Sequence, residues 1–191
     1  MSEWHRRIKQ GNWSLFLDRD GVLNERPGDG YVLNPAQFQW SDGSLEALVD
    51  LRGIFEHIVV VTNQQGVGKG LMQKPDLEEI NMRMLAEIKE AGGHVDGIYS
   101  ATGLRLSDSF RRKPGPGMAL EAARDFPGIC FSRSIMAGDT FSDMLFGFRL
   151  GMVTVMIGPG NVPAACHHLV DFRFASLWDF TTFMVKGIRN S

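Results

Sequence analysis

The sequence predicts an α/β protein built on a doubly wound, mostly parallel β-sheet. Short apolar runs alternate along the chain with stretches in which apolar residues recur at helical spacing. One run, residues 58–61, is β-branched throughout, which is typical of a strand covered on both faces. Glycines follow many of these runs, for example Gly66 and Gly138. Strands that alternate with helices indicate right-handed βαβ units and hence a Rossmann-like sheet.

The elements follow from these patterns in chain order. We expect strands over residues 14–17, 58–61, 95–100, 134–137 and within 151–157. We expect helices over residues 44–55, 75–91, 118–125 and 142–150. Ser44 is a suitable N-cap for the first helix, while Pro75 and Gly92 frame the second.

The connecting segments are read from composition. Residues 24–43 have no helical period and predict a long, structured loop. Residues 101–117 predict a polar, basic loop, and the pattern over residues 170–186 is mixed. The polar segment 1–12 is expected to be flexible, and residues 13–191 are expected to form a single domain.

Composition excludes several classes of protein. The formal net charge of −2 disfavours a nucleic-acid-binding protein, which usually carries a basic excess. No apolar run reaches the length of a membrane span, and the N-terminus lacks the apolar region of a signal peptide, so a cytoplasmic protein is expected. Cys130 and Cys166 lie far apart and in no metal-binding spacing, which predicts two reduced thiols. The sequence leaves the oligomeric state open.

The first candidate motif is Asp18-Arg19-Asp20-Gly21, at the end of the first predicted strand. Two carboxylates so close together repel each other unless a cation or a proton intervenes. A surface Asp-Gly turn is the alternative interpretation. The motif therefore suggests a cation site at this strand end.

The second motif follows the strand over residues 58–61 and begins with Thr62, Asn63 and Gln64 before a glycine-rich turn. Hydroxyl, amide and backbone N–H groups are good donors to a phosphate group. The spacing does not match a Walker A loop, which would need glycine at position 63 and serine or threonine at position 70. An ordinary glycine-rich turn remains the alternative.

Two further motifs complete the set. Arg112 and Lys113 precede a predicted helix, where they would bind a phosphoryl group, unless they belong to a solvated basic loop. Asp139 follows the strand over residues 134–137, and Asp143 lies one helical turn later. With Asp18, Asp139 offers the hard oxygen ligands that suit Mg²⁺, and Asp143 would hold a metal-bound water. The alternative is that Asp139 or Thr140 caps the next helix.

Together the four motifs resemble the haloacid dehalogenase-like (HAD-like) phosphatase superfamily. Residues 18–24, the 30–43 segment with Tyr31, and the motifs at Thr62 and Arg112 resemble the subgroup that contains heptose bisphosphate and histidinol-phosphate phosphatases. The similarity extends from about residue 14 to residue 160. Many members carry a Cys and His zinc loop before the Arg-Lys-Pro motif, but residues 100–111 contain neither residue type, so structural zinc is not expected.

The resemblance implies roles for individual residues. Asp18 would be the nucleophile, Asp20 the general acid/base, Thr62 a phosphate ligand and Lys113 the stabilising cation. Mg²⁺ would be held by the Asp18 carboxylate, the Asp20 backbone carbonyl and Asp139.

The spacing of these positions limits how the substrate is recognised. Neither the segment between Asp20 and Thr62 nor that between Thr62 and Lys113 is long enough for a separate cap domain. Loops 24–43 and 101–112 would therefore contact the leaving group. The candidate substrate-binding residues are Asn24, Tyr31, Asn63, Gln64 and Arg112.

The resulting hypothesis is Mg²⁺-dependent hydrolysis of a small phosphomonoester through an aspartyl-phosphate. A sugar phosphate such as D-glycero-D-manno-heptose 1,7-bisphosphate is the expected substrate. Histidinol phosphate and a nucleic-acid 3′-phosphate are the alternatives, and a non-catalytic binding module is a third class. All four catalytic positions carry suitable residues, which disfavours the binding module.

Overall fold

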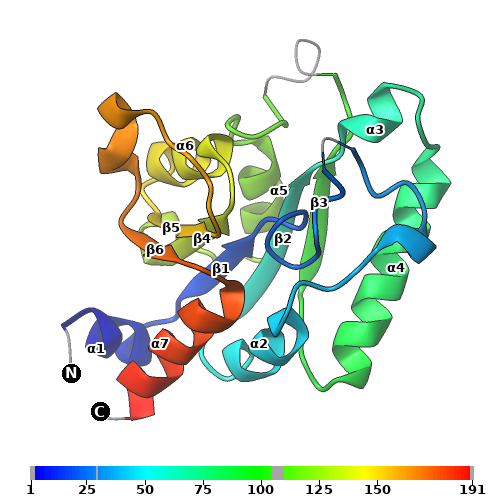
Figure 1. Ribbon diagram of the computed structural model, residues 1–191. Coiled ribbons are helices and arrows are strands. Elements are labelled where there is room, and N and C mark those ends of the chain that lie inside the picture. The colour runs from blue at the N-terminus through cyan, green and yellow to red at the C-terminus, as the bar shows by residue number, and fades with distance from the viewer. Residues whose placement is uncertain (1–2, 29, 105–109, 190–191) are drawn as a thin grey trace.

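A six-stranded, wholly parallel sheet forms the centre of the protein in the computed structural model, which describes residues 3–28, 30–104 and 110–189 (Figure 1). The strand order is β3-β2-β1-β4-β5-β6, the order of a doubly wound Rossmann-type sheet. The strands are β1 (Ser14–Leu17), β2 (His57–Asn63), β3 (Gly97–Ala101), β4 (Ser134–Gly138), β5 (Val153–Ile157) and β6 (Phe172–Phe174).

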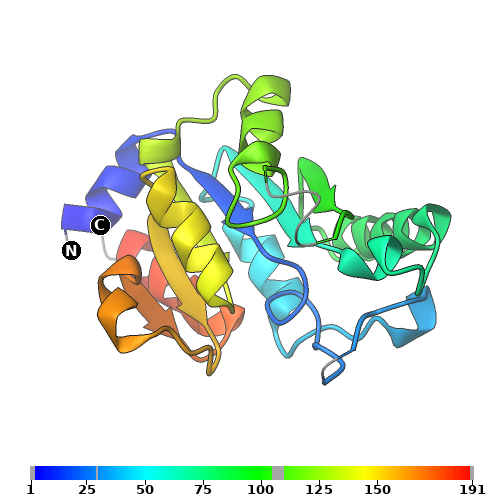
Figure 2. The same ribbon diagram turned by 90° about the horizontal axis from the view of Figure 1, so that it is seen from above.

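Helices cover both faces of this sheet. The α-helices are α1 (Glu3–Gln10), α2 (Ser44–Leu51), α3 (Gln65–Gly68), α4 (Lys74–Glu90), α5 (Gly117–Asp125), α6 (Phe141–Arg149) and α7 (Leu177–Arg189). Short 3₁₀ turns span η1 (Pro35–Gln37), η2 (Phe131–Arg133) and η3 (Ala164–Leu169). Figure 2 shows α2 and α5 on opposite sides of the strands. The predicted α/β sheet is confirmed.

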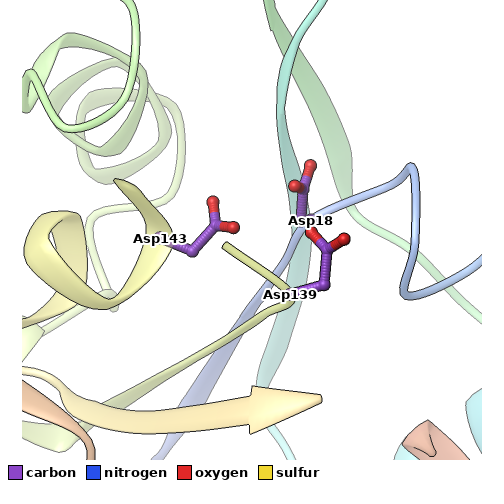
Figure 3. A group of neighbouring side chains, drawn as sticks. All are labelled: Asp18, Asp139 and Asp143. Carbon is purple, nitrogen blue, oxygen red and sulfur yellow. The ribbon is translucent and has the colours of Figure 1, made fainter. Parts of the chain in front are cut away.

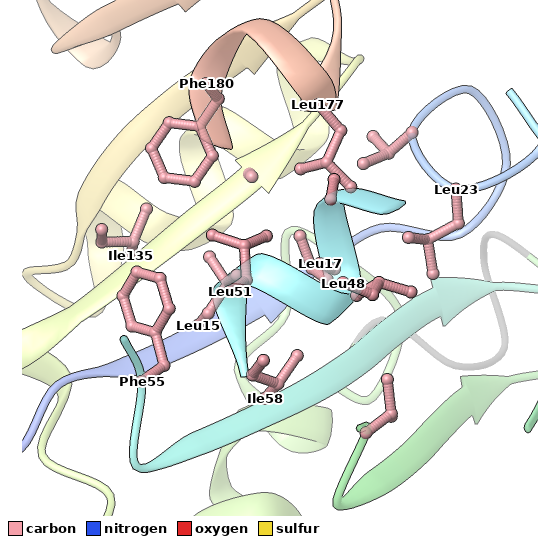
Figure 4. Close-up of a cluster of buried hydrophobic side chains, with 14 of the residues drawn as sticks. Leu15, Leu17, Leu23, Leu48, Leu51, Phe55, Ile58, Ile135, Leu177 and Phe180 are labelled. Atoms are coloured by element: carbon pink, nitrogen blue, oxygen red, sulfur yellow. The ribbon is translucent and has the colours of Figure 1, made fainter. Parts of the chain in front are cut away.

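Successive residues of β1 point to opposite faces and belong to two different cores. Leu15 and Leu17 pack with residues of α1, α2, α4 and α7, as Figure 4 shows for α2 and α7. Phe16, between them, packs with residues of α5 and α6. All three side chains are fully buried, so β1 is apolar on both sides, as its sequence predicts.

The predicted strands and helices lie where the sequence places them, with ends that differ by a few residues. One difference concerns the start of α2, where Gly43, with φ +70°, occupies the N-cap position predicted for Ser44. The Ser44 hydroxyl instead donates a hydrogen bond to the carbonyl of Leu23. The mixed pattern after residue 170 becomes β6 and α7.

The N-terminal segment, for which the sequence predicts no helix, is helical over its described residues. Residues 3–10 form α1, which lies beside α7 (Figure 1). Ile8 is buried in the core shared with α7, and Trp4 stacks near Phe172 and Phe183. The sequence did not indicate this helix, because its few apolar residues lie on one side of a helix whose partner is far away in sequence. The flexibility of residues 1–12 stays a prediction.

The topology places the loops that follow β1 and β4 next to each other. Within the sheet, β1 has β2 as its neighbour on one edge and β4 as its neighbour on the other edge. The strand order therefore reverses direction at β1. Such a reversal opens a crevice at the carboxyl ends of the strands, where ligands bind in α/β proteins. Over the described ranges, no further folded domain interrupts the connections between β1, β2 and β3. Among these same residues, no helix has the length and hydropathy required to cross a membrane.

Candidate active site

A pocket of about 300 Å³ opens at the carboxyl ends of β1 and β2 and beside the start of α6. Asp18 and Asp20 follow β1 and line the pocket, Thr62 and Asn63 end β2, and Arg112 precedes α5. A pocket of this volume is at the small end of the range for small-molecule sites. The crevice predicted from the order of the strands is therefore lined by the polar residues of three separate motifs.

Three carboxylates converge at one side of this pocket. Ligand oxygens of Asp18, Asp139 and Asp143 all lie within 4.8 Å of one another. Figure 3 shows Asp18 and Asp139 side by side at the ends of their strands, with Asp143 reaching in from the first turn of α6. The cluster arises because β1 and β4 are adjacent and parallel, with Leu17 opposite Ala137.

Two glycines beside the carboxylates leave the space that this cluster occupies. Gly21 has φ +91°, and a Cβ at this position would overlap the carboxylate of Asp139. Gly138 is equally close to the Asp143 side chain. A side chain at either position would displace a carboxylate, so both glycines allow the acidic groups to approach the backbone.

Lys113 lies beneath the pocket and neutralises part of this negative charge. Its Nζ lies 3.0 Å from Oδ1 of Asp18 and 2.6 Å from Oδ1 of Asp143. Asn63 holds the Lys113 backbone in both directions, because its Nδ2 donates to the Lys113 carbonyl and its Oδ1 accepts from the Lys113 N–H. The end of β2 therefore positions the lysine.

Burial and mutual repulsion perturb the acidic groups. Burial, with the nearby charges of Asp143 and Asp20, raises the pKa of Asp18 to about 6 against the opposing effect of Lys113. Burial and the charge of Asp18 raise the pKa of Asp139 to about 7. Burial lowers the pKa of Lys113, but Asp143 and Asp18 outweigh it and raise that pKa overall. The cluster thus has a deficit of positive charge.

Asp20 is held differently, by a set of hydrogen-bond donors. Burial alone would raise its pKa, but the Arg19 guanidinium and the amide of Gln64 hold it below the usual value. Arg19 donates to both Asp20 oxygens, and Asn24 Nδ2 donates to Oδ1 at 3.0 Å. Gln64 Nε2 donates to Oδ2 at 2.7 Å. The carboxylate is fixed in orientation while one side of it lines the pocket.

Comparison with known proteins finds relatives that are named as phosphatases. Residues 110–177 match the family model described as HAD-hydrolase-like. The chain is 38% identical over 173 residues to D-glycero-alpha-D-manno-heptose-1,7-bisphosphate 7-phosphatase of Mycobacterium bovis, a match that covers 88% of this chain and 89% of that one. The chain belongs to the HAD-like phosphatases.

Other comparisons place this HAD-like phosphatase among the same relatives. It is 35% identical over 139 residues to D-glycero-beta-D-manno-heptose-1,7-bisphosphate 7-phosphatase of Helicobacter pylori, covering 72% of this chain and 79% of that one. A crystal structure of D,D-heptose 1,7-bisphosphate phosphatase from B. bronchiseptica, complexed with magnesium and phosphate, has a TM-score of 0.80 and 25% identity. That match covers 91% of this chain and 98% of the other.

Most residues predicted for the site of this HAD-like phosphatase are brought together. Of the candidate substrate ligands, Tyr31, Asn63 and Arg112 line the pocket. Asn24 and Gln64 do not, because their side chains are fully buried and directed to Asp20. This position does not favour their predicted direct contact with substrate, which stays an untested prediction. The loop 101–112, which is expected to contact the leaving group, includes residues 105–109, which lie outside the described residues.

Several residues in the site were not predicted. Arg26 lines the pocket, and its Nη2 donates to the Asp20 carbonyl and to Asp139 Oδ1, both at 3.0 Å. Thr140 and Ser142 also line the pocket. Nothing in the sequence around Arg26 predicts that it belongs to the site, because it is a single arginine in a loop without a periodic pattern. Thr140 was considered as a helix cap, and it caps α6, with its hydroxyl donating to Asp143 Oδ2 at 2.5 Å.

The donor set fits a hard divalent cation. Asp18 and Asp139 offer carboxylate oxygens, and the Asp20 carbonyl lies close enough to Asp139 to share the Arg26 guanidinium with it. Oxygen ligands without sulfur or imidazole suit Mg²⁺. The absence of a Cβ at Gly21 keeps the Asp139 carboxylate within this group.

Proposed function

We propose that this HAD-like phosphatase hydrolyses the 7-phosphate of a D-glycero-D-manno-heptose 1,7-bisphosphate through a phosphorylated Asp18. The observation that carries the chemistry is the common pocket of Asp18, Asp20 and Thr62, with Lys113 paired to Asp18 beneath it. The substrate is supported by the names of the relatives in Mycobacterium bovis and Helicobacter pylori.

Asp18 attacks the phosphorus and forms an aspartyl-phosphate, which divides one difficult hydrolysis into two easier steps. Lys113 orients this carboxylate by its contact with Oδ1 and offsets the charge of the transferring group. The Thr62 hydroxyl donates to a phosphoryl oxygen from the end of β2. These groups stand at the floor of the pocket, where exclusion of water strengthens each interaction.

Asp20 moves the protons of the reaction. It protonates the leaving oxygen of the sugar and then accepts a proton from the water that attacks the aspartyl-phosphate. Arg19 and Gln64 favour the ionised carboxylate before substrate binds. An anionic phosphate group placed beside Asp20 raises its pKa by like-charge repulsion and so favours the protonated form needed first.

The metal centre of the proposal consists of Asp18, Asp139 and the Asp20 carbonyl, with Asp143 acting through a bound water. When bound by these residues, Mg²⁺ would supply positive charge that favours phosphoryl transfer. Thr140 and Lys113 hold Asp143 in place through its two oxygens. The ion supplies the positive charge that the cluster lacks.

The pocket wall supports a small, doubly anionic substrate. Arg26 and Arg112 line it, and Lys69 lies 5.2 Å from the ring centroid of Tyr31, another lining residue. Positive side chains around a small pocket favour a second phosphate over a neutral leaving group. The uncapped site leaves this recognition to the loops around Tyr31 and Arg112, in agreement with a small-molecule partner.

The proposal is tested by assaying phosphate release from both anomers of the heptose bisphosphate and from histidinol phosphate, with and without Mg²⁺. We expect Mg²⁺-dependent release from one or both heptose anomers, with the 1-phosphate retained in the product as seen by ³¹P NMR. The Asp18→Asn variant should lose more than about 10³-fold in kcat while it stays folded. Equal, poor turnover of all three esters would exclude the proposed substrate.

A further inference from the structure

The amide of Gln64 connects two groups of the site that have different tasks. Its Nε2 donates to Asp20 Oδ2 at 2.7 Å and to Thr62 Oγ1 at 2.9 Å. The residue lies between the end of β2 and the start of α3, and its side chain is fully buried. An amide nitrogen carries two hydrogens, so these two bonds use its whole donor capacity.

The bond to Thr62 sets the direction in which that hydroxyl donates. Because Thr62 Oγ1 accepts from Gln64, its single hydrogen is directed elsewhere. Across the part of the chain that the structure describes, no acceptor for this hydrogen is found, and Thr62 lines the pocket. Gln64 therefore prepares the Thr62 hydroxyl as a donor to an anion.

The bond to Asp20 completes the set of donors around that carboxylate. Arg19 donates to both oxygens and Asn24 to Oδ1, while Gln64 donates to Oδ2 from the end of the neighbouring strand β2. Asn24 donates its other bond to the carbonyl of Glu25 and does not reach Thr62 in the described hydrogen-bond network. Only one of these two buried amides thus joins Asp20 to Thr62.

We propose that Gln64 is a positioning residue that couples the phosphate-binding hydroxyl of Thr62 to the proton-transferring carboxylate of Asp20. The inference rests on the proposed function and assigns a role within that site. A glutamate at position 64 would have the same shape but would place a second carboxylate against Asp20. A shorter amide would not span both partners. The bridge therefore requires both the length and the donor pair of glutamine.

The test compares Gln64→Met, which keeps the length but removes both donors, with Asn24→Leu, which removes the donors to Asp20 and to the Glu25 carbonyl but none to Thr62. The Mg²⁺-loaded proteins are titrated with inorganic phosphate by calorimetry. We expect Gln64→Met to weaken phosphate binding about two- to tenfold, the effect of one lost hydrogen bond. Asn24→Leu should leave phosphate binding unchanged. In a Thr62→Val background, Gln64→Met should cause no further weakening, because the two effects share one hydroxyl.

A second measurement uses the leaving group. The kcat/KM values for heptose bisphosphate and for p-nitrophenyl phosphate are compared, because a nitrophenolate leaves without much help from a proton donor. We expect both variants to lose at least about tenfold more activity on the sugar ester than on the aryl ester, since both disturb Asp20. If the residue had only a structural role, its replacement would lower kcat/KM for both esters equally.

Unchanged phosphate affinity in Gln64→Met, or further weakening in the Thr62→Val background, would overturn the inference. Equal losses on the two esters would overturn the link to Asp20. If Gln64→Met does not fold, the shorter Gln64→Asn is measured in its place, with the same outcomes expected. If the wild-type protein hydrolyses neither ester, the proposed function fails, and the calorimetric cycle alone decides whether Gln64 acts on Thr62.

Discussion

The ammonium of Lys113 lies 2.6 Å from Oδ1 of Asp143, and both side chains are buried. The pair is part of a cluster in which the carboxylates of Asp18, Asp139 and Asp143 outnumber the cations, because only Lys113 and Arg26 pair with them among the described residues. The lysine therefore contributes to stability as well as to the chemistry. Its removal leaves buried carboxylates without their counter-ion.

We expect Lys113→Met to lower the free energy of unfolding at pH 8 without metal by about 3–5 kcal/mol, as for other buried pairs that lose one partner. Urea denaturation followed by circular dichroism measures this. Lys74→Met is a matched control, because Lys74 is exposed and pairs with Glu78 only at the surface of α4. Equal stability of the two variants would show that the cluster does not depend on the lysine.

The raised pKa values predict an unusual pH dependence. In the folded protein without metal, the pKa of Asp18 is about 6 and that of Asp139 about 7, against an ordinary value of 3.8. Between about pH 4 and pH 7 the folded state therefore binds more protons than the unfolded chain, and stability falls as the pH rises. Chemical unfolding in EDTA at several pH values measures this slope.

With Mg²⁺ bound, stability should instead rise with pH, because the cation binds only ionised carboxylates. Its affinity is expected to rise by up to about tenfold per pH unit between pH 5 and pH 7 for each proton released. Calorimetric titration in two buffers of different ionisation enthalpy counts those protons. Asp139→Asn should reduce both the proton release and the pH slope in EDTA, and a Mg²⁺ affinity independent of pH would contradict the prediction.

Gly21 provides a test of the geometry beside Asp139. Gly21→Ala introduces a Cβ that overlaps the Asp139 carboxylate at a backbone φ of +91°, so Mg²⁺ affinity should fall by at least about tenfold. Gly92→Ala is the control, because Gly92 has φ +88° but no atom within 4 Å of the added Cβ. Both variants should lose about 1–3 kcal/mol of stability from the left-handed backbone. Comparable Mg²⁺ affinities in the two variants would contradict the close approach.

Helix α1 offers a test far from the site. Ile8 is almost fully buried against α7, so Ile8→Ala should destabilise the protein by about 2–5 kcal/mol. Lys9→Ala, on the exposed side of the same helix, should change the stability by less than about 0.5 kcal/mol. Thermal unfolding measures both, and an unchanged midpoint for Ile8→Ala would favour the flexible segment predicted from the sequence.

The sequence was informative where function depends on positions at strand ends. The apolar runs before Asp18 and Asp139 are local signals, and parallel strands bring their carboxyl ends to one edge. The convergence of Asp18, Thr62 and Lys113 could therefore be predicted before any coordinates. The position of Arg26 could not, because its loop has no periodic pattern and its partners, Asp20 and Asp139, follow β1 and β4.

The alternation of strands and helices and the order of the polar groups along the chain can be read from the sequence alone. Hydrophobic periodicity and glycine positions are local properties, which is why they are readable residue by residue. Which of these polar groups face the pocket depends instead on the packing of the folded chain. Gln64 and Asn63 are neighbours at the end of β2, yet one is buried against Asp20 while the other lines the pocket. Burial depends on what packs over each side chain, and those partners come from distant segments.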